Sequence, residues 1–270
     1  MQTFDTPGAL LVTITCPVGD VVIDTHDAPT AQVDVVALRD DEATREAVAN
    51  TLVELRPHGD GHELVVEVPK RHGSFFGREP RIRVAVTAPH ASGLGFTTAS
   101  ADVAANGTFG DVRGRTASGD VTVREAASLR LQTASGDLRA DDVRGDATLK
   151  SASGDIKIGR VAGTLDASVV SGDLHVASAE RGGSANAVSG DIDLVAVTEG
   201  PVEVRTVSGD VTVGVREGAQ VHVDVTTVSG DLRSDLPLSD APAGAGGAGP
   251  AVDIRGRTVS GDLRVRRAAS

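Results

Sequence analysis

Two patterns in this sequence bring metal-binding side chains close together. The first is His58-Gly59-Asp60-Gly61-His62, which offers two imidazoles and one carboxylate within five residues. Imidazole and carboxylate groups are common zinc ligands. The same residues are typical of a glycine-rich hairpin turn, and the pattern offers no further ligand nearby. We therefore expect a turn here and no metal.

The second pattern is a row of aspartates, one in each copy of a recurring Ser-Gly-Asp tripeptide. If the copies stack in register, their carboxylates lie ~4.8 Å apart and repel one another by about 1 kcal/mol in water. Calcium could offset this repulsion, as in glycine- and aspartate-rich β-rolls, but those use two glycine-rich turns per coil for ligands. We favour hydrogen bonds to the carboxylates from turn amides or the neighbouring serine hydroxyl.

The sequence offers little for catalysis. Serines are plentiful, but those in the repeat are turn residues by position, and we find no grouping of nucleophile, base and orienting residue. Cys16 is the single cysteine, so the chain can form neither an internal disulfide nor a thiolate metal cage. We predict a protein that is not an enzyme, with no catalytic, cofactor-binding or metal-binding residues and no cofactor.

One loop could make contacts outside the chain. It runs from Pro69 to Arg78 and combines clustered positive charge with two adjacent phenylalanines, which suit an anionic lipid or a protein partner. The alternative is a long hairpin whose phenylalanines fold back on the protein. The residues of this possible contact loop are Lys70, Arg71, Phe75, Phe76 and Arg78.

The elements that position these groups follow from the repeat. Ser-Gly-Asp followed by an aliphatic residue occurs eight times, at intervals of 17 to 21 residues apart from a last interval of 31. Such a period predicts a solenoid in which neighbouring coils bury each other's apolar face. The repeat turns are Ser118, Gly119, Asp120, Ser135, Gly136, Asp137, Ser153, Gly154, Asp155, Ser171, Gly172, Asp173, Ser189, Gly190, Asp191, Ser208, Gly209, Asp210, Ser229, Gly230, Asp231, Ser260, Gly261 and Asp262.

One coil can be read from Ser118 to Thr133. After the Ser-Gly-Asp turn, alternating residues form a strand, a second turn follows at Glu125-Ala126-Ala127, and a second strand completes the coil. We predict an all-β fold, a parallel right-handed β-helix (β-solenoid) with ~18-residue coils. The inward positions of later coils include Leu232 and Leu263.

Two regions depart from this period. Residues 1–95 lack it and show several alternating strands with one short helix near 43–49, so we expect an irregular N-terminal β cap followed by solenoid repeats over 96–270. Residues 236–250 are rich in Pro, Gly and Ala, and we expect a flexible insertion there, which explains the long last interval.

Composition narrows the functions. The net charge is −12, with five phenylalanines and no tryptophan or tyrosine, which argues against nucleic-acid binding. No apolar run approaches the roughly 20 residues of a transmembrane helix. The first 38 residues contain no Lys or Arg, and Cys16 follows no lipoprotein-like signal, so we expect a cytoplasmic protein, with surface export by another route as the alternative.

The Ser-Gly-Asp repeat, the Phe4 to Gly8 opening, Gly19-Asp20 and the loop described above together resemble a bacterial family of unknown function, described as putative adhesins with β-strand repeats. The architecture is also similar to that of bactofilins. The resemblance implies a non-catalytic, adhesin-like binding module for an unknown macromolecule. The alternative is a cytoplasmic scaffold that polymerises end to end, so the chain is expected to be a monomer or to self-associate through its ends.

Overall fold

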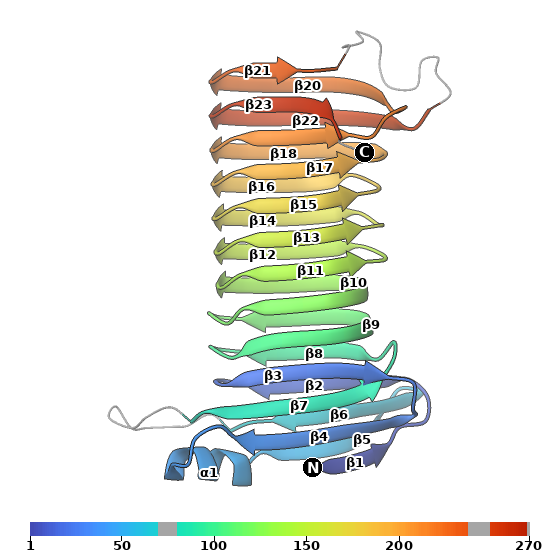
Figure 1. Cartoon of the computed structure of the whole chain (residues 1–270), viewed down its shortest axis with the longest axis vertical. Coiled ribbons are helices and arrows are strands. Elements are labelled where there is room, and N and C mark those ends of the chain that lie inside the picture. Colours follow the sequence, from blue (N-terminus) through green and yellow to red (C-terminus); the bar gives the residue numbers. More distant parts are fainter. Residues whose placement is uncertain (70–79, 237–248, 269–270) are drawn as a thin grey trace. The chain divides into compact units, whose positions relative to one another are not determined.

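The computed structural model describes residues 1–69, 80–236 and 249–268, and it is built almost entirely from β-strands (Figure 1). Its only helix among these residues is α1 (Glu42–Ala49). No helix in the described ranges has the length and apolar character needed to cross a bilayer. The prediction of an all-β, parallel solenoid is confirmed.

The chain divides into two compact units, Met1–Gly136 and Asp137–Ser270. The boundary near residue 95 between an N-terminal cap and the solenoid stays a prediction. Strands before residue 95 pair in parallel with strands after it, although their spacing along the sequence is irregular.

Unit 2 (Asp137–Ser270) consists of coils with two strands each, and every strand pairs in parallel with the equivalent strand of a neighbouring coil. The register is set by the repeat, because Ser171 of one coil lies beside Ser189 of the next. The strands are β11 (Leu138–Val143), β12 (Ala147–Ser153), β13 (Ile156–Val161), β14 (Leu165–Ser171), β15 (Leu174–Ala179), β16 (Gly183–Ser189), β17 (Ile192–Val197), β18 (Gly200–Ser208), β19 (Val211–Val215), β20 (Gln220–Ser229), β21 (Leu232–Ser234), β22 (Ala251–Ser260) and β23 (Leu263–Arg267).

The core of unit 2 is a narrow column of aliphatic side chains between its two stacks of parallel strands. Alternation puts every second residue inward, and small branched residues fill the space between strands that follow one another at ~4.8 Å. The predicted inward positions of the coils up to Val213, and those of the coil formed by β22 and β23, are at most 3% exposed: Ile156, Ile158, Leu174, Val176, Ile192, Leu194, Val211, Val213, Leu263 and Val265.

The coils of unit 2 do not follow sequence order at the C-terminal end. Strand β22 lies between β18 and β20, and β23 lies between β19 and β21. The last coil of the chain is therefore inserted beneath the one that precedes it. The predicted insertion at 236–250 falls mostly on residues 237–248, which lie outside the described residues.

Leu232 corrects one prediction about the core. It was expected to occupy an inward slot, but its side chain is 47% exposed. Its strand β21 pairs with β23 and, within the described part of the chain, with no second strand. An inward residue in an outermost coil has an apolar neighbour on one side only, so burial is incomplete.

Unit 1 (Met1–Gly136) combines parallel rungs with antiparallel strands. The parallel strands follow one another at regular intervals along the sequence only from residue 93 onward. The sequence repeat is therefore not visible before that point. The strands are β1 (Gln2–Asp5), β2 (Leu10–Cys16), β3 (Asp20–His26), β4 (Thr30–Ala37), β5 (Leu52–His58), β6 (Gly61–Glu67), β7 (Ile82–Pro89), β8 (Gly93–Thr98), β9 (Asp102–Thr116) and β10 (Val121–Ser135).

The first coil of the chain also lies inside a stack. Strand β2 pairs in parallel with both β6 and β8, and β3 pairs in parallel with both β7 and β9. Beyond them, β5 pairs antiparallel with β6, β4 with β7 and β1 with β4. Strand β10 runs unbroken through the turn predicted at Glu125-Ala126-Ala127, where its pairing with β9 shifts by one residue.

The predicted helix is confirmed as α1. Asp41 caps it, because its carboxylate accepts a hydrogen bond of 2.7 Å from the Thr44 amide, which satisfies one free N–H of the first turn. Buried Thr44 and Ala47 form its inner face. The Thr44 hydroxyl accepts a hydrogen bond of 3.2 Å from the Arg81 amide just before β7, which ties the helix to the sheet.

Candidate functional site

The Ser-Gly-Asp tripeptides form one corner of each coil, where the chain passes from one sheet to the other. Apart from Gly119, these glycines adopt positive φ angles, 136° at Gly190 and 137° at Gly209, which glycine reaches at little cost. Backbone hydrogen bonds join each corner to the next. The Gly190 N–H donates to the Ser208 carbonyl at 3.0 Å, and the Ile192 N–H donates to the Asp210 carbonyl at 2.9 Å. The tripeptide therefore has an architectural task in every coil.

The aspartate carboxylates take part in the same corner. In unit 2, one carboxylate oxygen of every repeat aspartate except Asp231 accepts a hydrogen bond of 2.8–3.0 Å from the aspartate amide of the neighbouring coil. In unit 1, Asp102 accepts one from the Asp120 amide at 2.9 Å. The predicted hydrogen bonds from turn amides to the carboxylates are present, and the donor lies in the adjacent coil.

The order of this row follows the order of the coils. The Asp262 amide donates to Asp210, and the Asp231 amide donates to Asp262, so Asp262 lies between the other two. The sequence order of the aspartates suggested that Asp231 would follow Asp210 directly. The inserted coil formed by β22 and β23 is the reason for the difference.

We expect calcium to leave the stability of the protein unchanged, because most of the stacked carboxylates already have one oxygen bound by an amide. Calcium prefers six to eight oxygen ligands, and removing the amide bonds to free them would cost stability. Thermal melts followed by circular dichroism in millimolar calcium and in excess chelator should therefore coincide. A rise in Tm with calcium would contradict this assignment.

The His58 to His62 segment is a hairpin turn. It joins the antiparallel strands β5 and β6, with His58 beside Gly61 in the register. Within the described ranges, no three side chains of His, Cys, Asp or Glu are grouped as a metal site would require. Cys16 is buried in β2, where desolvation raises the pKa of its thiol to about 11, so the thiolate that reacts with electrophiles is scarce.

The contact loop predicted from Lys70, Arg71, Phe75, Phe76 and Arg78 lies outside the described residues. Its proposed role stays a prediction.

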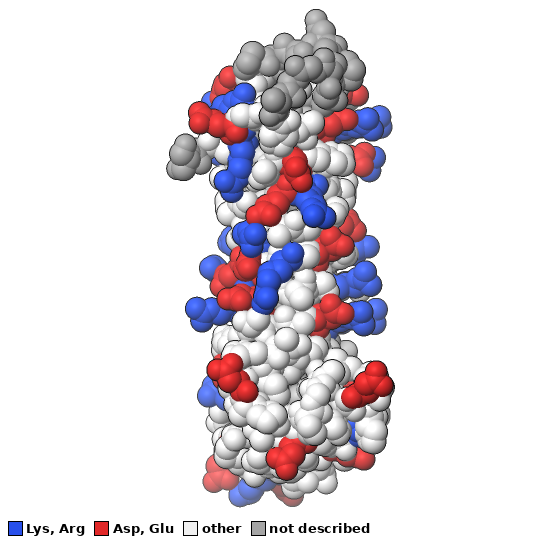
Figure 2. Space-filling view, turned by 90° about the vertical axis from the view of Figure 1, so that its right-hand side faces the viewer, with Lys and Arg blue, Asp and Glu red and all other residues white. Residues whose placement is uncertain are grey.

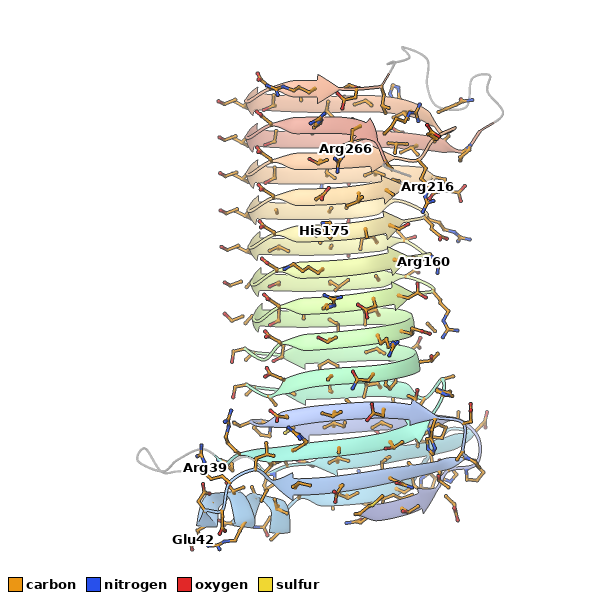
Figure 3. The ribbon with its side chains drawn as sticks, in the orientation of Figure 1. Arg39, Glu42, Arg160, His175, Arg216 and Arg266 are labelled. Carbon is orange, nitrogen blue, oxygen red and sulfur yellow. The ribbon has the colours of Figure 1, made fainter. Side chains whose placement is uncertain are left out.

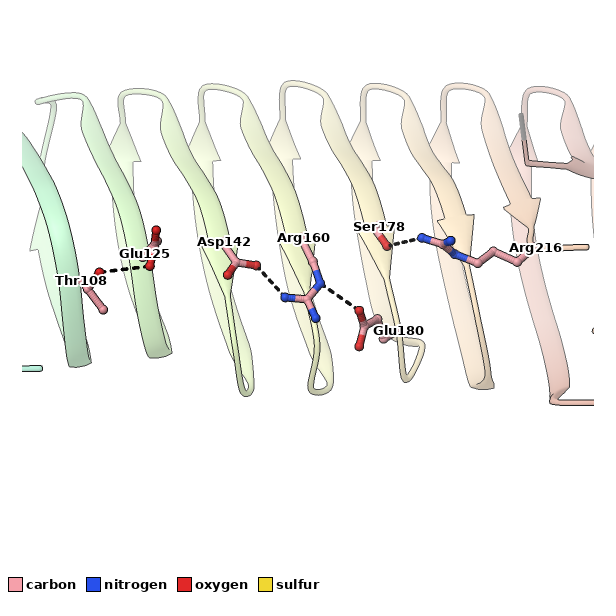
Figure 4. A network of polar contacts seen from close by, with 7 residues as sticks. All are labelled: Thr108, Glu125, Asp142, Arg160, Ser178, Glu180 and Arg216. Carbon is pink, nitrogen blue, oxygen red and sulfur yellow. Dashed lines mark hydrogen bonds and ion pairs between the residues drawn. The ribbon is translucent and has the colours of Figure 1, made fainter. Parts of the chain in front are cut away.

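Charges in unit 2 are largely paired with each other. At the corner opposite the aspartate row, Arg160 binds Asp142 at 3.0 Å and Glu180 at 2.8 Å, so one guanidinium links three coils (Figure 4). These two carboxylates raise the pKa of Arg160. Arg216 donates to the Ser178 hydroxyl at 3.4 Å in the same row. Figure 2 shows acidic and basic side chains interspersed on the face that it displays.

A shallow hollow of about 270 Å³ in unit 2 illustrates this pairing. It is lined by the cationic or titratable side chains of Arg139, Lys157 and His175, which stand in successive coils. Each has an acidic neighbour, at 3.2 Å, 3.4 Å and 3.2 Å respectively. Figure 3 shows His175 and Arg266 on the sheet face and Arg160 and Arg216 at the corner. A ligand anion would have to compete with these acids.

A larger hollow, of about 410 Å³, lies on the outer sheet face of unit 1. We call it the arginine hollow. Gly95 leaves it open, since a Cβ there would meet no atom closer than 3.8 Å. The outward residues of β2, β8, β9 and β10 line it in two parallel rows. One row is Thr13, Gly95, Arg113 and Arg130, and the other is Thr15, Thr97, Arg115 and Gln132.

The arginines of this hollow are weakly compensated. Arg113 lies 3.9 Å from Asp111, and both side chains are more than 60% exposed, so solvent screens the pair. Arg115 donates to the neutral amide oxygen of Gln132 at 3.3 Å. Within the described ranges, neither Arg115 nor Arg130 has a carboxylate within salt-bridge distance. In a chain of net charge −12, this is a local concentration of positive charge.

Two acids stand at the far rim. Glu63 of β6 accepts a hydrogen bond of 2.7 Å from the Thr13 hydroxyl, and Glu67 lies beside Thr15 in the register. Strand β2 separates both from the three arginines, which lie on β9 and β10. The anionic part of a ligand is therefore favoured on the β8 to β10 side.

Sequence reasoning did not single out this hollow. One signal was present: Arg113 and Arg130 are 17 residues apart, as are Arg115 and Gln132, so a coil length predicts that they are neighbours. The contribution of Thr13 and Thr15 had no such signal. They reach the hollow because β2 pairs with β8 from far away in the sequence.

Three solved structures match the chain over most of its length at low sequence identity. One is described as a putative adhesin from Parabacteroides merdae (12% identity, TM-score 0.45, 98% of this chain and 94% of that one). Another is a putative adhesin from Parabacteroides distasonis (14% identity, TM-score 0.43, 98% and 95%). A third is a putative cell adhesion protein from Clostridium sporogenes (9% identity, TM-score 0.29, 96% and 92%).

The search of curated proteins found no match. The family model described as Toastrack DUF4097 matches residues 13–266, which is nearly the whole chain and includes both units. The bacterial adhesin-like family expected from the repeat is consistent with this match, whereas the similarity to bactofilins has no further support. The chain belongs to the Toastrack DUF4097 family.

Proposed function

We propose that this protein is a non-catalytic, adhesin-like binding module that holds an acidic segment of a partner protein in the arginine hollow. The observation that carries the proposal is the group formed by Arg113, Arg115 and Arg130 on a rigid sheet face, without close carboxylates to neutralise two of them. Guanidinium groups present paired N–H donors that match a carboxylate.

The spacing of the arginines favours an extended peptide. Arg113 and Arg115 lie two residues apart on β9, so they project from the same face about 6.6 Å apart. Acidic side chains at alternate positions of an extended peptide have the same separation. The hydroxyls of Thr15 and Thr97 and the amide of Gln132 offer further polar partners beside the cations. Tyr and Trp faces, which sugar rings prefer, are absent from the sequence.

Binding fits this group better than catalysis. An arginine stays protonated at any physiological pH, so it cannot act as a general base. The described residues that line the hollow include no histidine, cysteine or carboxylate. Proton transfer would therefore need a group from outside the hollow.

The alternative, a scaffold that polymerises end to end, needs open parallel edges that can continue the stack. In unit 1, the strands beyond β6 and β7 are antiparallel, and α1 is tied to β7 beside them. Antiparallel strands interrupt the continuation of parallel coils at this side of the unit. We therefore favour the binding module over the polymerising scaffold.

The test uses a ten-residue peptide of alternating glutamate and serine, with heparin as a second probe. We expect the full chain to bind the peptide with salt-sensitive affinity, measured by calorimetry at low and at physiological salt. Each lost charged hydrogen bond is worth about 1.5–3 kcal/mol, so Arg113→Gln with Arg130→Gln should weaken binding more than tenfold. Gly95→Leu, which fills the hollow without changing charge, should also weaken it.

The matched control is Arg139→Gln with Arg233→Gln, which removes two arginines that are about equally exposed but lie in unit 2. Affinity should be unchanged in this variant. Equal loss in the control, or no binding of the peptide by the unmodified chain, would overturn the proposal. If the chain binds heparin and not the peptide, the ligand of the arginine hollow would be a sulfated polysaccharide instead of an acidic peptide.

A further inference from the structure

Unit 2 carries a line of exposed valines that the proposed function does not use. Each is the residue directly before a Ser-Gly-Asp corner, and each points outward from its strand. We call this line the valine stripe. In the order of the coils it consists of Val170, Val188, Val207, Val259 and Val228.

The stripe is the main apolar feature of the described surface. Its valines are 48–50% exposed, apart from Val228 at 79%, and they account for five of the ten large apolar side chains that are exposed in the described ranges. With strands ~4.8 Å apart, five valines extend over about 19 Å. Scattered exposed valines need no explanation, but a continuous apolar line is typical of an interaction surface.

The two sides of the stripe differ in charge. On one side, two residues earlier on the same strands, stand Arg205 and Arg257. Arg205 is bound by Glu203, whereas Arg257 has no ionic partner among the described residues. On the other side lies the corner with the exposed carboxylates of Asp210 and Asp262. Each of these uses one oxygen for the neighbouring amide, which leaves the second oxygen available.

We propose that a second copy of this chain packs on the valine stripe, with a two-fold axis that runs along it. This axis keeps each coil at its own height and exchanges left and right, so Arg257 of one copy faces Asp262 of the other. A two-fold axis across the stripe would place arginine against arginine instead. A closed dimer whose two surfaces are identical is the commonest arrangement of soluble homo-oligomers.

The size of the stripe predicts a weak dimer. A surface five coils long and three outward side chains wide buries on the order of 400 Å² per copy, about half of what stable interfaces bury. The valines would provide the dry centre, and the arginine and aspartate rows the charged rim. Association should therefore depend on concentration, and on salt through the rim.

The first measurement is sedimentation velocity of the full chain over a wide concentration range. We expect a monomer at low micromolar and a growing dimer fraction toward millimolar concentration, reduced by high salt. Val207→Lys should abolish the dimer, since it places a charge at the centre of the stripe. Val36→Lys is the matched control, because Val36 is 41% exposed and lies in unit 1; it should leave dimerisation unchanged.

The second measurement fixes the direction of the axis. Facing sheets lie about 10 Å apart, too far for a direct disulfide, so Val188→Cys is joined with a short bis-maleimide. With the axis along the stripe, position 188 meets its own copy and the single variant cross-links. With the axis across the stripe through Val207, position 188 meets 259, and only a mixture of Val188→Cys and Val259→Cys cross-links. Buried Cys16 should not react.

Cross-linking of Val188→Cys alone, together with loss of the dimer in Val207→Lys, supports the proposal. Cross-linking of the mixture only would overturn the assigned axis. A chain that stays monomeric at all concentrations, or a dimer that Val207→Lys leaves intact, would overturn the stripe as an interface.

Discussion

Replacing Gly190 by alanine is expected to lower the free energy of unfolding by at least about 3 kcal/mol. Two effects add. The φ angle of 136° lies in a region that other residues rarely adopt, and a Cβ would overlap the carbonyl oxygen of Gly172 in the neighbouring coil. That oxygen belongs to the backbone of a packed corner, so it cannot move away without disturbing the hydrogen bonds between coils. Urea denaturation followed by circular dichroism measures the loss.

Gly218→Ala separates the two effects. Gly218 also has a positive φ, of 84°, but a Cβ there would meet nothing within 4 Å. Conformational strain alone should cost about 1–2 kcal/mol. If both variants lose the same stability, crowding between corners contributes nothing, and the repeat glycine would be explained by its backbone conformation only.

A chain that ends at Pro250 should lose ordered structure in the coil formed by β20 and β21, although these residues remain in the chain. Strands β22 and β23 are the partners to which β20 and β21 pair, and Asp262 joins their aspartate to the rest of the row. Hydrogen exchange should show rapid exchange over residues 220–234, while residues 156–194 stay protected. A chain that ends at Arg267 is the control and should exchange like the full chain.

One outcome would contradict this expectation. The two coils share the same Ser-Gly-Asp register, with Ser229 and Ser208 both beside Ser260. If β20 can pair directly with β18 once β22 is removed, residues 220–234 will stay protected. The intermediate coil would then be replaceable, and the inserted order would not be required for stability.

The regular part of the fold was predictable because the two-residue alternation of each strand and the ~18-residue period of the coils indicate the same structure. Alternation decided which residues face inward, and the coil length decided which residues are neighbours, so Ser171 beside Ser189 follows from counting. The same reasoning explains why the amides of adjacent coils reach the aspartate carboxylates. These features depend on local geometry that is repeated in every coil.

The order of the coils was not predictable because the copies are nearly equivalent. Coil 251–267 and coil 220–234 present the same pattern to a neighbour, and the sequence does not say which one contacts β18. Exposed Leu232 is a result of that order. The arginine hollow was missed for a related reason, since it needs the long-range pairing of β2 with β8.

The internal position of the first coil in unit 1 and of the last coil in unit 2 has a consequence for folding kinetics. In an ordinary repeat array, each coil can add to the one synthesised before it, and growth follows the chain. Here β20 and β21 emerge before the coil that has to lie beneath them, so they must wait for residues 251–267 or detach from a premature pairing. Contacts of long sequence separation slow folding. We therefore expect a slow final step in refolding, and equally slow fraying of these two coils, because each of them lies between two other pairs of strands.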